Sequence, residues 1–411
     1  MSFLYNLSLY LVAAVLRVVA LFNPKIKLFV AGRKNTFELL EQNLNPTDKV
    51  IWMHAASLGE YEQGLPILEK LKTNYPDHKF LLTFFSPSGY EVKKGKTPAN
   101  IETYLPLDTK ENARKIVALV KPKMTIFIKY EVWPNLLSQL KEQQCPTLLV
   151  SGIFNQKQAY FKSYGGFLRN ALKNFDYFFV QDQNSIELLR RIGYTNSSIS
   201  GDSRYDRVTQ IVEQNNSLEF MDAFLQGKNC IVAGSTWPPG EALLVDYINK
   251  DKSNYKFVIA PHNIKKQHVE SIVNSLKVPK MKYSELDLEA IGQTKVLILD
   301  TVGILTKVYS YADIAYVGGG FETGLHNTLE PAVFGIPVII GPKYHRFIEA
   351  IALVNNKGVI SVKDKIEFNT TLSQLVDNPT ERANLGRTNM DYIFKNKGAT
   401  DQVVAYINKH L

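Results

Sequence analysis

Cysteine is scarce in this sequence. The 411 residues include two cysteines, Cys145 and Cys230, at the edges of apolar segments and without metal-ligand spacing. Such cysteines are typical of core residues in a reducing compartment, so neither a disulfide framework nor a metal site is predicted. Low-complexity stretches, short repeats and RNA- or DNA-binding motifs are also missing. We therefore predict ordinary globular domains and no nucleic-acid partner.

The length and composition are those of a globular protein with two domains. A hydrophobic fraction of 45% and a charged fraction of 21% are ordinary, but 411 residues exceed one usual core. The formal net charge is +9. A basic balance suits an acidic partner such as nucleic acid, an anionic membrane or a phosphorylated substrate, and charge alone does not choose among them.

An interrupted apolar run opens the chain. Phe3–Phe22 is about long enough to span or lie in a bilayer, although Asn6 and Arg17 interrupt it. A cleaved signal peptide is not expected, because no basic segment precedes the run and no small-residue cleavage site follows it. We predict a membrane anchor or interfacial helix within residues 1–34; the alternative is an amphipathic helix packed on the protein's own core. The positive-inside bias places the downstream chain in the cytoplasm, since basic residues follow the run at Lys25, Lys27, Arg33 and Lys34.

Strands and helices alternate from residue 49 onward, which predicts an α/β protein with parallel, doubly wound sheets. Predicted strands of the first half are Val50–His54, Lys79–Phe85, Thr125–Ile128, Thr147–Val150, Tyr177–Val180 and Ser198–Ser200. After a stretch without strand signals, the second half continues with Cys230–Ala233, Lys256–Ala260, Val296–Leu299, Ile314–Val317 and Pro337–Ile340. Two Rossmann-like halves are therefore expected, with a boundary near 205–228 and the ligand in a cleft between them. The last helix, about 400–410, can pack back across that boundary.

The glycine-rich stretch 318–341 organises the second half. Three glycines, Gly318–Gly320, follow a buried strand and permit a sharp turn and close approach of another group. A helix is predicted over Leu325–Phe334, with Asn327 and Glu330 just inside it on one face. Glu330 can accept hydrogen bonds from a ribose diol, and exposed N–H groups at the helix start favour an anion. The alternative is a plain βαβ unit in which Glu330 caps its own helix.

Three residues of the first half are candidates for catalysis. Glu60 follows the first strand in the stretch HAASLGE and can act as a general base to a hydroxyl; the alternative is a helix-start acid stabilised by the dipole. Glu131 follows another buried strand, so both acids are expected at one sheet edge. Arg204 lies near the domain boundary, where a cation can neutralise a leaving phosphate; an ordinary surface arginine is the alternative.

Four loops of the second half, 234–236, 261–263, 300–304 and 318–327, each follow a predicted parallel strand. They are therefore expected at the same carboxyl edge of the sheet, where ligands bind in α/β proteins.

Six motifs occur in order along the chain: HAASLGE from His54, YLPLD from Tyr104, EVWPN from Glu131, AGSTW from Ala233, DTVGI from Asp300 and GLHNTLEP…GIPVIIGP from Gly324. Over nearly the whole chain the sequence resembles the Kdo transferases, which move 3-deoxy-D-manno-octulosonic acid (Kdo) from CMP-Kdo to the lipid A precursor. The resemblance implies the GT-B glycosyltransferase fold, two Rossmann-like domains facing across a cleft.

The resemblance also implies roles for individual residues. Glu60 matches the general base of the family, Glu131 matches the second glutamate of its ETELWPN stretch, and Arg204 stands where the family usually has a lysine that stabilises the transition state. Glu330 is expected on the ribose of CMP. The CMP-binding set is Ser235, Thr236, Pro261, His262, Val302, Gly303, Ile304, Gly319, Asn327, Thr328, Leu329 and Glu330. No metal and no cofactor are implied.

The sequence departs from the family pattern at three positions. Lys129 replaces the first glutamate of ETELWPN, His262 replaces an arginine, and Ile304 replaces the glutamate of DT-x-GEL. These departures put individual CMP contacts in doubt. Lys265, Lys266 and His268 are candidates for the phosphate contact of the missing arginine.

We therefore predict an inverting Kdo transferase that acts on lipid IVA at the cytoplasmic face of the inner membrane. Its partners are CMP-Kdo, the lipid A precursor and the inner leaflet. Residues 1–34 form the membrane helix, 35–210 the acceptor-binding domain and 211–411 the CMP-Kdo-binding domain. Two alternatives stay open: a nucleotide-sugar epimerase of the same architecture, and a non-catalytic lipid-binding protein at the membrane surface.

Overall fold

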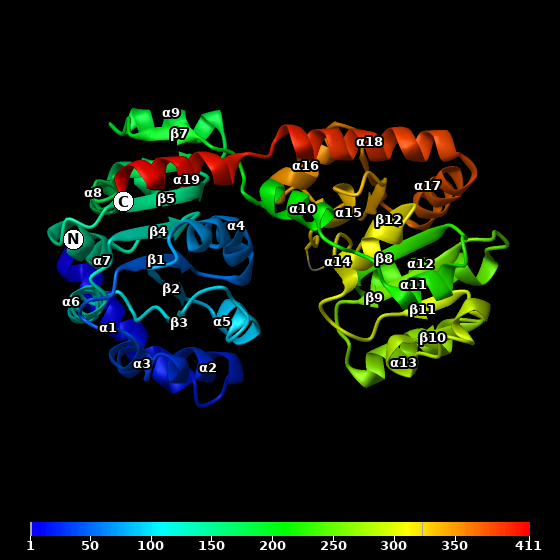
Figure 1. Ribbon diagram of the computed structural model, residues 1–411, viewed down its shortest axis with the longest axis horizontal. Coiled ribbons are helices and arrows are strands. Elements are labelled where there is room, and N and C mark those ends of the chain that lie inside the picture. Colours follow the sequence, from blue (N-terminus) through cyan, green and yellow to red (C-terminus); the bar gives the residue numbers. More distant parts are fainter. Residues whose placement is uncertain (1, 323) are drawn as a thin grey trace. The chain divides into compact units, whose positions relative to one another are not determined.

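The computed structural model describes residues 2–322 and 324–411, and its contacts divide the chain into two compact units (Figure 1). Unit 1 comprises Met1–Arg207 and Lys397–Leu411, and unit 2 comprises Val208–Asn396. The first division falls next to the boundary expected after residue 210. Each unit is an α/β layered structure.

Unit 1 is built on a parallel sheet with the strand order β3-β2-β1-β4-β5-β6-β7. The central strands are buried on both faces, as their continuous apolar sequences predict. The strands are β1 Val50–Ala55, β2 Lys79–Phe84, β3 Ile101–Tyr104, β4 Met124–Ile128, β5 Thr147–Gly152, β6 Tyr177–Val180 and β7 Ser197–Ile199. The edge strand β3 was not predicted from the sequence.

Helices cover both faces of this sheet. Gly64 in α4 lies so close to β1 and β4 that a Cβ there would meet the Met53 sulfur at 2.8 Å. The helices are α1 Ser2–Val19, α2 Pro24–Gly32, α3 Thr36–Asn43, α4 Leu58–Asn74, α5 Pro87–Lys93, α6 Lys110–Val120, α7 Pro134–Glu142, α8 Gly166–Leu172, α9 Gln183–Arg191 and α19 Ala399–His410. Helix α10 Arg204–Glu213 begins in unit 1 and continues into unit 2.

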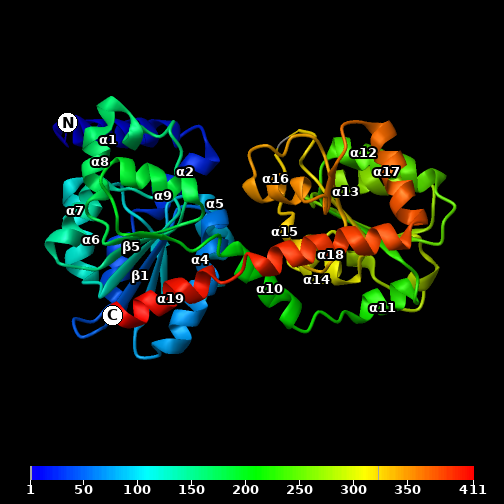
Figure 2. The same cartoon turned by 90° about the horizontal axis from the view of Figure 1, so that it is seen from above.

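The last helix of the chain belongs to unit 1. Helix α19 packs against α4, and both views show it alongside this unit (Figures 1 and 2). Its side chains Val403, Val404 and Ile407 are buried in the same apolar cluster as β1 and β2. Unit 1 is therefore completed by residues that follow unit 2 in the sequence.

The N-terminal helices α1 and α2 carry exposed apolar side chains. In Figure 1 helices α1–α3 (blue) lie beside β3 and α6. The Tyr5 hydroxyl donates to Asp108 Oδ2 at 2.8 Å, and the Asn135 amide donates to Asn6 Oδ1 at 2.9 Å, so α1 is held on unit 1 by its polar side chains. In the part of the chain that the structure describes, no helix has the length and apolar content needed to cross a membrane.

Unit 2 is built on a second parallel sheet with the order β10-β11-β9-β8-β12-β13-β14. Its strands are β8 Cys230–Thr236, β9 Lys256–Pro261, β10 Lys280–Lys282, β11 Val296–Ile298, β12 Ile314–Val317, β13 Val338–Ile340 and β14 Val359–Ser361. Its helices are α11 Glu219–Leu225, α12 Pro238–Lys250, α13 Lys266–Ser275, α14 Leu305–Val308, α15 Leu329–Ala332, α16 Ile348–Asn355, α17 Lys365–Asp377 and α18 Pro379–Lys395. The α/β class with two parallel, doubly wound sheets is confirmed.

One predicted helix is much shorter than expected. The sequence predicted a helix over Leu325–Phe334, but α15 covers only Leu329–Ala332. Gly324 has a positive φ, and the His326 N–H donates to the Gly318 carbonyl, which keeps this segment folded as a loop. Asn327 therefore precedes the helix instead of lying inside it. A helix of four residues has a small dipole, which weakens the argument for an anion site at its N-terminus.

Candidate active site

Two acidic side chains of unit 1 lie at the carboxyl ends of β1 and β4. Glu60 is in the first turn of α4, which follows β1, and Glu131 is in the loop between β4 and α7. Strands β1 and β4 are paired in parallel, with His54 opposite Phe127. The structure thus brings the two predicted acids to one sheet edge, because parallel neighbours end on the same side.

The Glu60 carboxyl is buried and held by the backbone of its own loop. The Ala56 N–H donates to Glu60 Oε2 at 2.5 Å. Burial, together with the negative charge of Glu131, raises the pKa of Glu60 to about 7. The positive charge of Lys129 and the loop hydrogen bonds oppose this rise but do not cancel it. A carboxyl with this pKa can accept a proton near neutral pH far better than an ordinary surface glutamate.

The Glu131 carboxylate contacts two ring nitrogens, one of tryptophan and one of histidine. Trp133 Nε1 donates to Glu131 Oε2 at 2.8 Å, and His54 Nε2 lies 3.4 Å from the same oxygen. Lys129, two residues earlier, has a φ of 72°, in the left-handed region that non-glycine residues seldom occupy. The backbone turn at the end of β4 is thus unusual at the residue where the sequence departs from the ETELWPN pattern.

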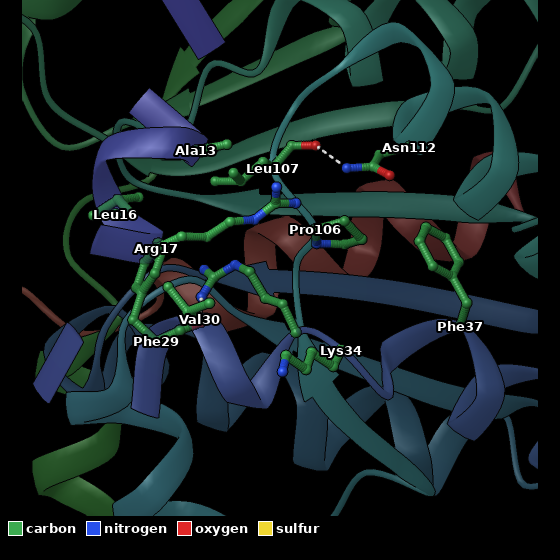
Figure 3. Close-up of a pocket in the computed structure, with 11 residues that line it drawn as sticks. Ala13, Leu16, Arg17, Phe29, Val30, Lys34, Phe37, Pro106, Leu107 and Asn112 are labelled. Carbon is green, nitrogen blue, oxygen red and sulfur yellow. Dashed lines mark hydrogen bonds between the residues drawn. The ribbon is translucent and has the colours of Figure 1, made fainter. Parts of the chain in front are cut away.

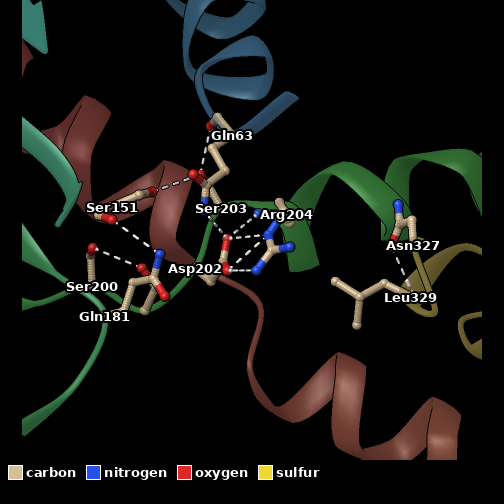
Figure 4. A network of polar contacts seen from close by, with 10 residues as sticks. Gln63, Ser151, Gln181, Ser200, Asp202, Ser203, Arg204, Asn327 and Leu329 are labelled. Carbon is tan, nitrogen blue, oxygen red and sulfur yellow. Dashed lines mark hydrogen bonds and ion pairs between the residues drawn. The ribbon is translucent and has the colours of Figure 1, made fainter. Parts of the chain in front are cut away.

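Arg204 is the predicted cation of unit 1, and it is bound to a buried aspartate. Its Nη2 lies 2.7 Å from Asp202 Oδ2, and its Nε lies 3.0 Å from the same oxygen (Figure 4). Burial alone would raise the pKa of Asp202, but the Arg204 guanidinium and the Gln63 amide hold it below its usual value. The guanidinium position is therefore fixed by a carboxylate that stays charged.

The glycine loop of unit 2 allows a close contact between two strand ends. A Cβ at Gly318 would lie 2.1 Å from the Ser235 carbonyl oxygen, so only glycine fits. Ser235 itself has a φ of 50°, and Gly319 one of 88°. The backbone at the end of β8 and the backbone directly after β12 are thereby packed together, as the predicted convergence of these segments requires.

Asn327 and Glu330 are joined by a hydrogen bond. Asn327 Nδ2 donates to Glu330 Oε1 at 2.9 Å, and the Thr306 hydroxyl donates to Glu330 Oε2 at 3.1 Å. Asn327 Oδ1 accepts the Leu329 N–H at 3.0 Å. Thr328 is buried next to them. Two oxygens fixed in this way can accept the hydroxyl hydrogens of a diol, although Thr306 was not predicted.

The loop with Val302, Gly303 and Ile304 precedes α14, and Thr306 stands in that helix. Val302 is strongly exposed and Gly303 has a φ of 96°. The contact with Glu330 comes from Thr306 in the helix that follows the loop, whereas Ile304 offers no polar group in place of the family's glutamate.

His262 lies in a stack of three rings. It packs on Trp237 with ring centroids 4.8 Å apart and on His326 at 4.5 Å, and it follows Pro261 at the end of β9. Trp237 Nε1 donates to His326 Nε2 at 2.9 Å, so His326 is neutral. Burial lowers the pKa of His326 to about 4, with a smaller contribution from His262, and burial also lowers the pKa of His262. Neither ring supplies the positive charge of the family's arginine at neutral pH.

The proposed substitutes for that arginine differ in their surroundings. His268 Nε2 lies 3.1 Å from Glu241 Oε1, which also accepts from the Thr236 hydroxyl. The Nε2 atom of His268 is thus already paired with the Glu241 carboxylate. Lys265 and Lys266 stand at the start of α13 and carry the positive charge nearest to His262 along the chain.

A small cavity lies against the N-terminal helices of unit 1 and has a volume of about 220 Å³ (Figure 3). Its wall combines apolar side chains with three cations and no acid. The lining residues are Ala13, Leu16, Arg17, Phe29, Val30, Arg33, Lys34, Phe37, Pro106, Leu107 and Asn112.

Residues 31–207 match the sequence family described as 3-deoxy-D-manno-octulosonic-acid transferase (kdotransferase). The 3-deoxy-D-manno-octulosonic acid transferase of Aquifex aeolicus is 30% identical over 354 residues, which cover 83% of this chain and 91% of that protein. The chain belongs to the Kdo transferase family. The transferase of Haemophilus influenzae is 27% identical over 387 residues, covering 89% of this chain and 88% of that protein.

Solved structures confirm the predicted GT-B fold class of this Kdo transferase. UDP-GlcNAc 2-epimerase from Neisseria meningitidis has a TM-score of 0.61 at 14% identity, and it covers 88% of this chain and all of that one. Acinetobacter baumannii MurG has a TM-score of 0.57 at 12% identity, covering 88% of this chain and 99% of that one. These likenesses show the fold alone, which epimerases share, whereas the sequence family identifies the chain as a glycosyltransferase enzyme.

Several contacting residues were missed by sequence reasoning. Thr306, Trp237 and His326 touch predicted donor-site residues, and Asp108 caps α7 by accepting the N–H groups of Asn135 and Leu136. Trp237, His326 and Asp108 lie inside the motifs AGSTW, GLHNTLEP and YLPLD, so their place in these motifs could have identified them from the sequence. Thr306 lies two residues beyond DTVGI, and nothing in the sequence pattern pointed to it.

Proposed function

We propose that this Kdo transferase moves Kdo from CMP-Kdo to lipid IVA with inversion at C2, without a metal ion or other cofactor. The acceptor hydroxyl oxygen forms a bond to C2, and the bond from C2 to the phosphate oxygen breaks. CMP leaves with the bonding electron pair, and Glu60 takes the hydroxyl proton.

The buried Glu60 carboxyl is the observation that carries this proposal. Its pKa of about 7 means that a large fraction is ionised at neutral pH while the conjugate acid is still weak enough to hold a proton. Its position in the first turn of α4, at the carboxyl edge of the sheet, is where α/β proteins bind ligands. Glu131 raises the basicity of this carboxylate, because two neighbouring negative charges disfavour one another.

The donor is assigned to unit 2, Val208–Asn396, and the acceptor to unit 1. Glu330 and Asn327 present fixed oxygens for the ribose of CMP, and the backbone N–H groups near Ser235, Thr236 and Gly319 suit the phosphate. Arg204 supplies a cation whose guanidinium is oriented by Asp202. Pro261, His262, the 302–304 loop and Thr328–Leu329 complete the proposed CMP site.

The N-terminal helices place the enzyme on the cytoplasmic face of the inner membrane in this proposal. Exposed apolar side chains of α1, among them Leu11, Val15 and Val18, can enter the headgroup boundary of a bilayer. The cations Arg17 and Lys34 in the nearby cavity suit an anionic leaflet and a phosphorylated lipid acceptor.

The test is a transfer reaction with CMP-Kdo and a tetraacylated lipid A precursor, followed by CMP release, product mass and anomeric configuration. Wild type is expected to add Kdo with inversion, and Glu60→Gln is expected to lose about 10²–10⁴ in kcat, the usual contribution of a general base. Glu111→Gln is the matched control, because Glu111 is also a first-turn acid but is exposed on α6. Absence of transfer by wild type, or full activity of Glu60→Gln, would overturn the proposal.

A further inference from the structure

His54 is a buried histidine that the proposed mechanism does not use. Its side chain is fully shielded from solvent in β1, two residues after Trp52 and directly opposite Thr83 in the parallel register of β1 and β2. Both ring nitrogens have partners: Nδ1 lies 2.9 Å from the Thr83 hydroxyl, and Nε2 lies 3.4 Å from Glu131 Oε2.

The hydrogen bonds around Thr83 determine which ring nitrogen carries the proton. Trp52 Nε1 can only donate, and it does so to the Thr83 hydroxyl oxygen at 2.9 Å. Among the described residues Thr83 has no partner for its hydroxyl hydrogen other than His54 Nδ1. Nδ1 therefore accepts, and the proton of the neutral ring is on Nε2, which faces Glu131.

We propose that His54 is a positioning residue of the transfer reaction: its Nε2–H holds the Glu131 carboxylate beside Glu60, and the Thr83 hydroxyl selects the tautomer that makes this possible. The proposal rests on the base role given to Glu60 above. It adds a chain of contacts, Trp52 to Thr83 to His54 to Glu131, that starts in the core and ends at the acids.

The surroundings of His54 leave it one orientation. Its ring packs edge-on against Phe127 at 5.8 Å and against Trp133 at 6.1 Å between centroids. Trp133 in turn packs on Phe85 at 4.6 Å and donates to the same Glu131 oxygen as His54. Rings packed on both sides resist rotation, so the histidine can direct the carboxylate instead of following it.

The position of Glu131 matters because its charge acts on Glu60. The charged or titratable groups that face this pair are His54 from β1, Lys129 from the β4–α7 loop and Tyr160 from the segment after β5. Lys129 favours the ionised form of Glu60, whereas Glu131 favours the protonated form. If Glu131 moves away, Glu60 keeps the Lys129 charge alone, and its pKa falls.

Two substitutions of His54 separate the functions of its two nitrogens. Glutamine places an amide near the position of Nε2 and can donate to Glu131, whereas asparagine reaches only the position of Nδ1. His54→Asn is expected to lower kcat/KM about ten- to a hundredfold, the loss of a hydrogen bond to a charged group, and to shift the acidic limb of its pH profile downward. His54→Gln is expected to retain most of the activity and the wild-type limb.

The tautomer is measured without turnover, by ¹⁵N chemical shifts of histidine-labelled full-length protein. The expected result is an Nε2–H ring for His54 in wild type and in Thr83→Ser, and loss of this preference in Thr83→Val. An Nδ1–H ring in wild type, or an unshifted pH profile in His54→Asn with its fold intact by circular dichroism, would overturn the proposal. Inactive wild-type enzyme with an Nε2–H ring would instead count against the proposed function.

Discussion

Asp202 is a buried carboxylate that stays charged because Arg204 and Gln63 bind it. Asp202→Asn removes the negative charge from a salt bridge whose Arg204 side chain is 24% exposed, and this costs less than breaking a fully buried pair. Asp202→Asn is expected to lower the free energy of unfolding by about 2 kcal/mol at pH 7. The measurement is urea unfolding of both proteins.

The Asp202 effect depends on pH with a definite sign. Folding lowers the pKa of Asp202 below the ordinary aspartate value of 3.8. The stabilisation that Asp202 contributes is therefore fully present above pH 3.8 and is lost as the pH falls through its lower pKa in the folded protein. The gap between wild type and Asp202→Asn should therefore shrink below about pH 4. Asp401→Asn, which breaks an exposed pair with Lys70, is the control and should change little at either pH. An unchanging gap would contradict the charge-based explanation.

At the residue scale, the sequence predicted which side chains stand at strand ends, but not their partners. Glu60 and Glu131 follow parallel strands that pair, so their common edge could be derived from chain order. The contact of Arg204 with Asp202, two residues earlier, and that of Glu330 with Thr306 in α14 depend on side-chain directions, which carry no periodic signal. The assigned roles of these residues stay predictions.

At the element scale, burial explains why the central strands were predicted, whereas only one of the edge strands, β7, was predicted. The central strands β1, β4 and β8 are continuous apolar runs because both their faces are covered. The missed strands β3, β10 and β14 are short edge strands, and β10 (Lys280–Lys282) has no buried residue. Edge pairing depends on the neighbouring strand, which the local sequence does not reveal.

Helix α1 combines a docked polar side with exposed apolar side chains. Leu11 and Val18 are 61% and 60% exposed, so charging them leaves the packing of unit 1 intact. The double substitution Leu11→Glu/Val18→Glu is expected to weaken binding to phosphatidylglycerol vesicles about tenfold or more. The helix then buries less apolar area in the bilayer, and its attraction to the anionic lipid is lost. Vesicle co-sedimentation gives the measurement.

Ile366→Glu is the matched control for α1, since Ile366 is an apolar residue of α17 that is even more exposed, at 77%. It should bind the vesicles as wild type does. Equal binding by the α1 double variant would mean that α1 does not contact the bilayer, and the interfacial-helix prediction would then be wrong.

At the scale of the whole molecule, unit 2 is inserted between two parts of unit 1. Asp206 in α10 accepts the backbone N–H groups of Gly398 and Thr400, so the start of α19 is bound where the chain first leaves unit 1. Gly398 has a φ of 115°, which lets the chain turn into the helix. The sequence suggested that the last helix can pack back across the domain boundary. Nothing in its pattern indicated that Asp206 binds the start of this helix.

Helix α19 should contribute substantially to the stability of unit 1. Ile407 is fully buried against α4, so Ile407→Ala is expected to lower the free energy of unfolding by about 2–4 kcal/mol through lost burial and a cavity. Urea unfolding and proteolysis of the folded protein give the measurement. Leu411→Ala, at an exposed position just beyond the helix, is the control and should have little effect. Equal stability of the two variants would mean that α19 is not part of the unit 1 core.

The insertion also fixes an order of events during synthesis. Unit 1 needs Val403, Val404 and Ile407 to close its core, and the ribosome makes them only after the whole of Val208–Asn396. At roughly 5–20 residues per second, that segment takes on the order of 10–40 s to translate. During this interval the nascent unit 1 exposes an apolar face on α4, where a chaperone can bind, although most of its sequence has already emerged.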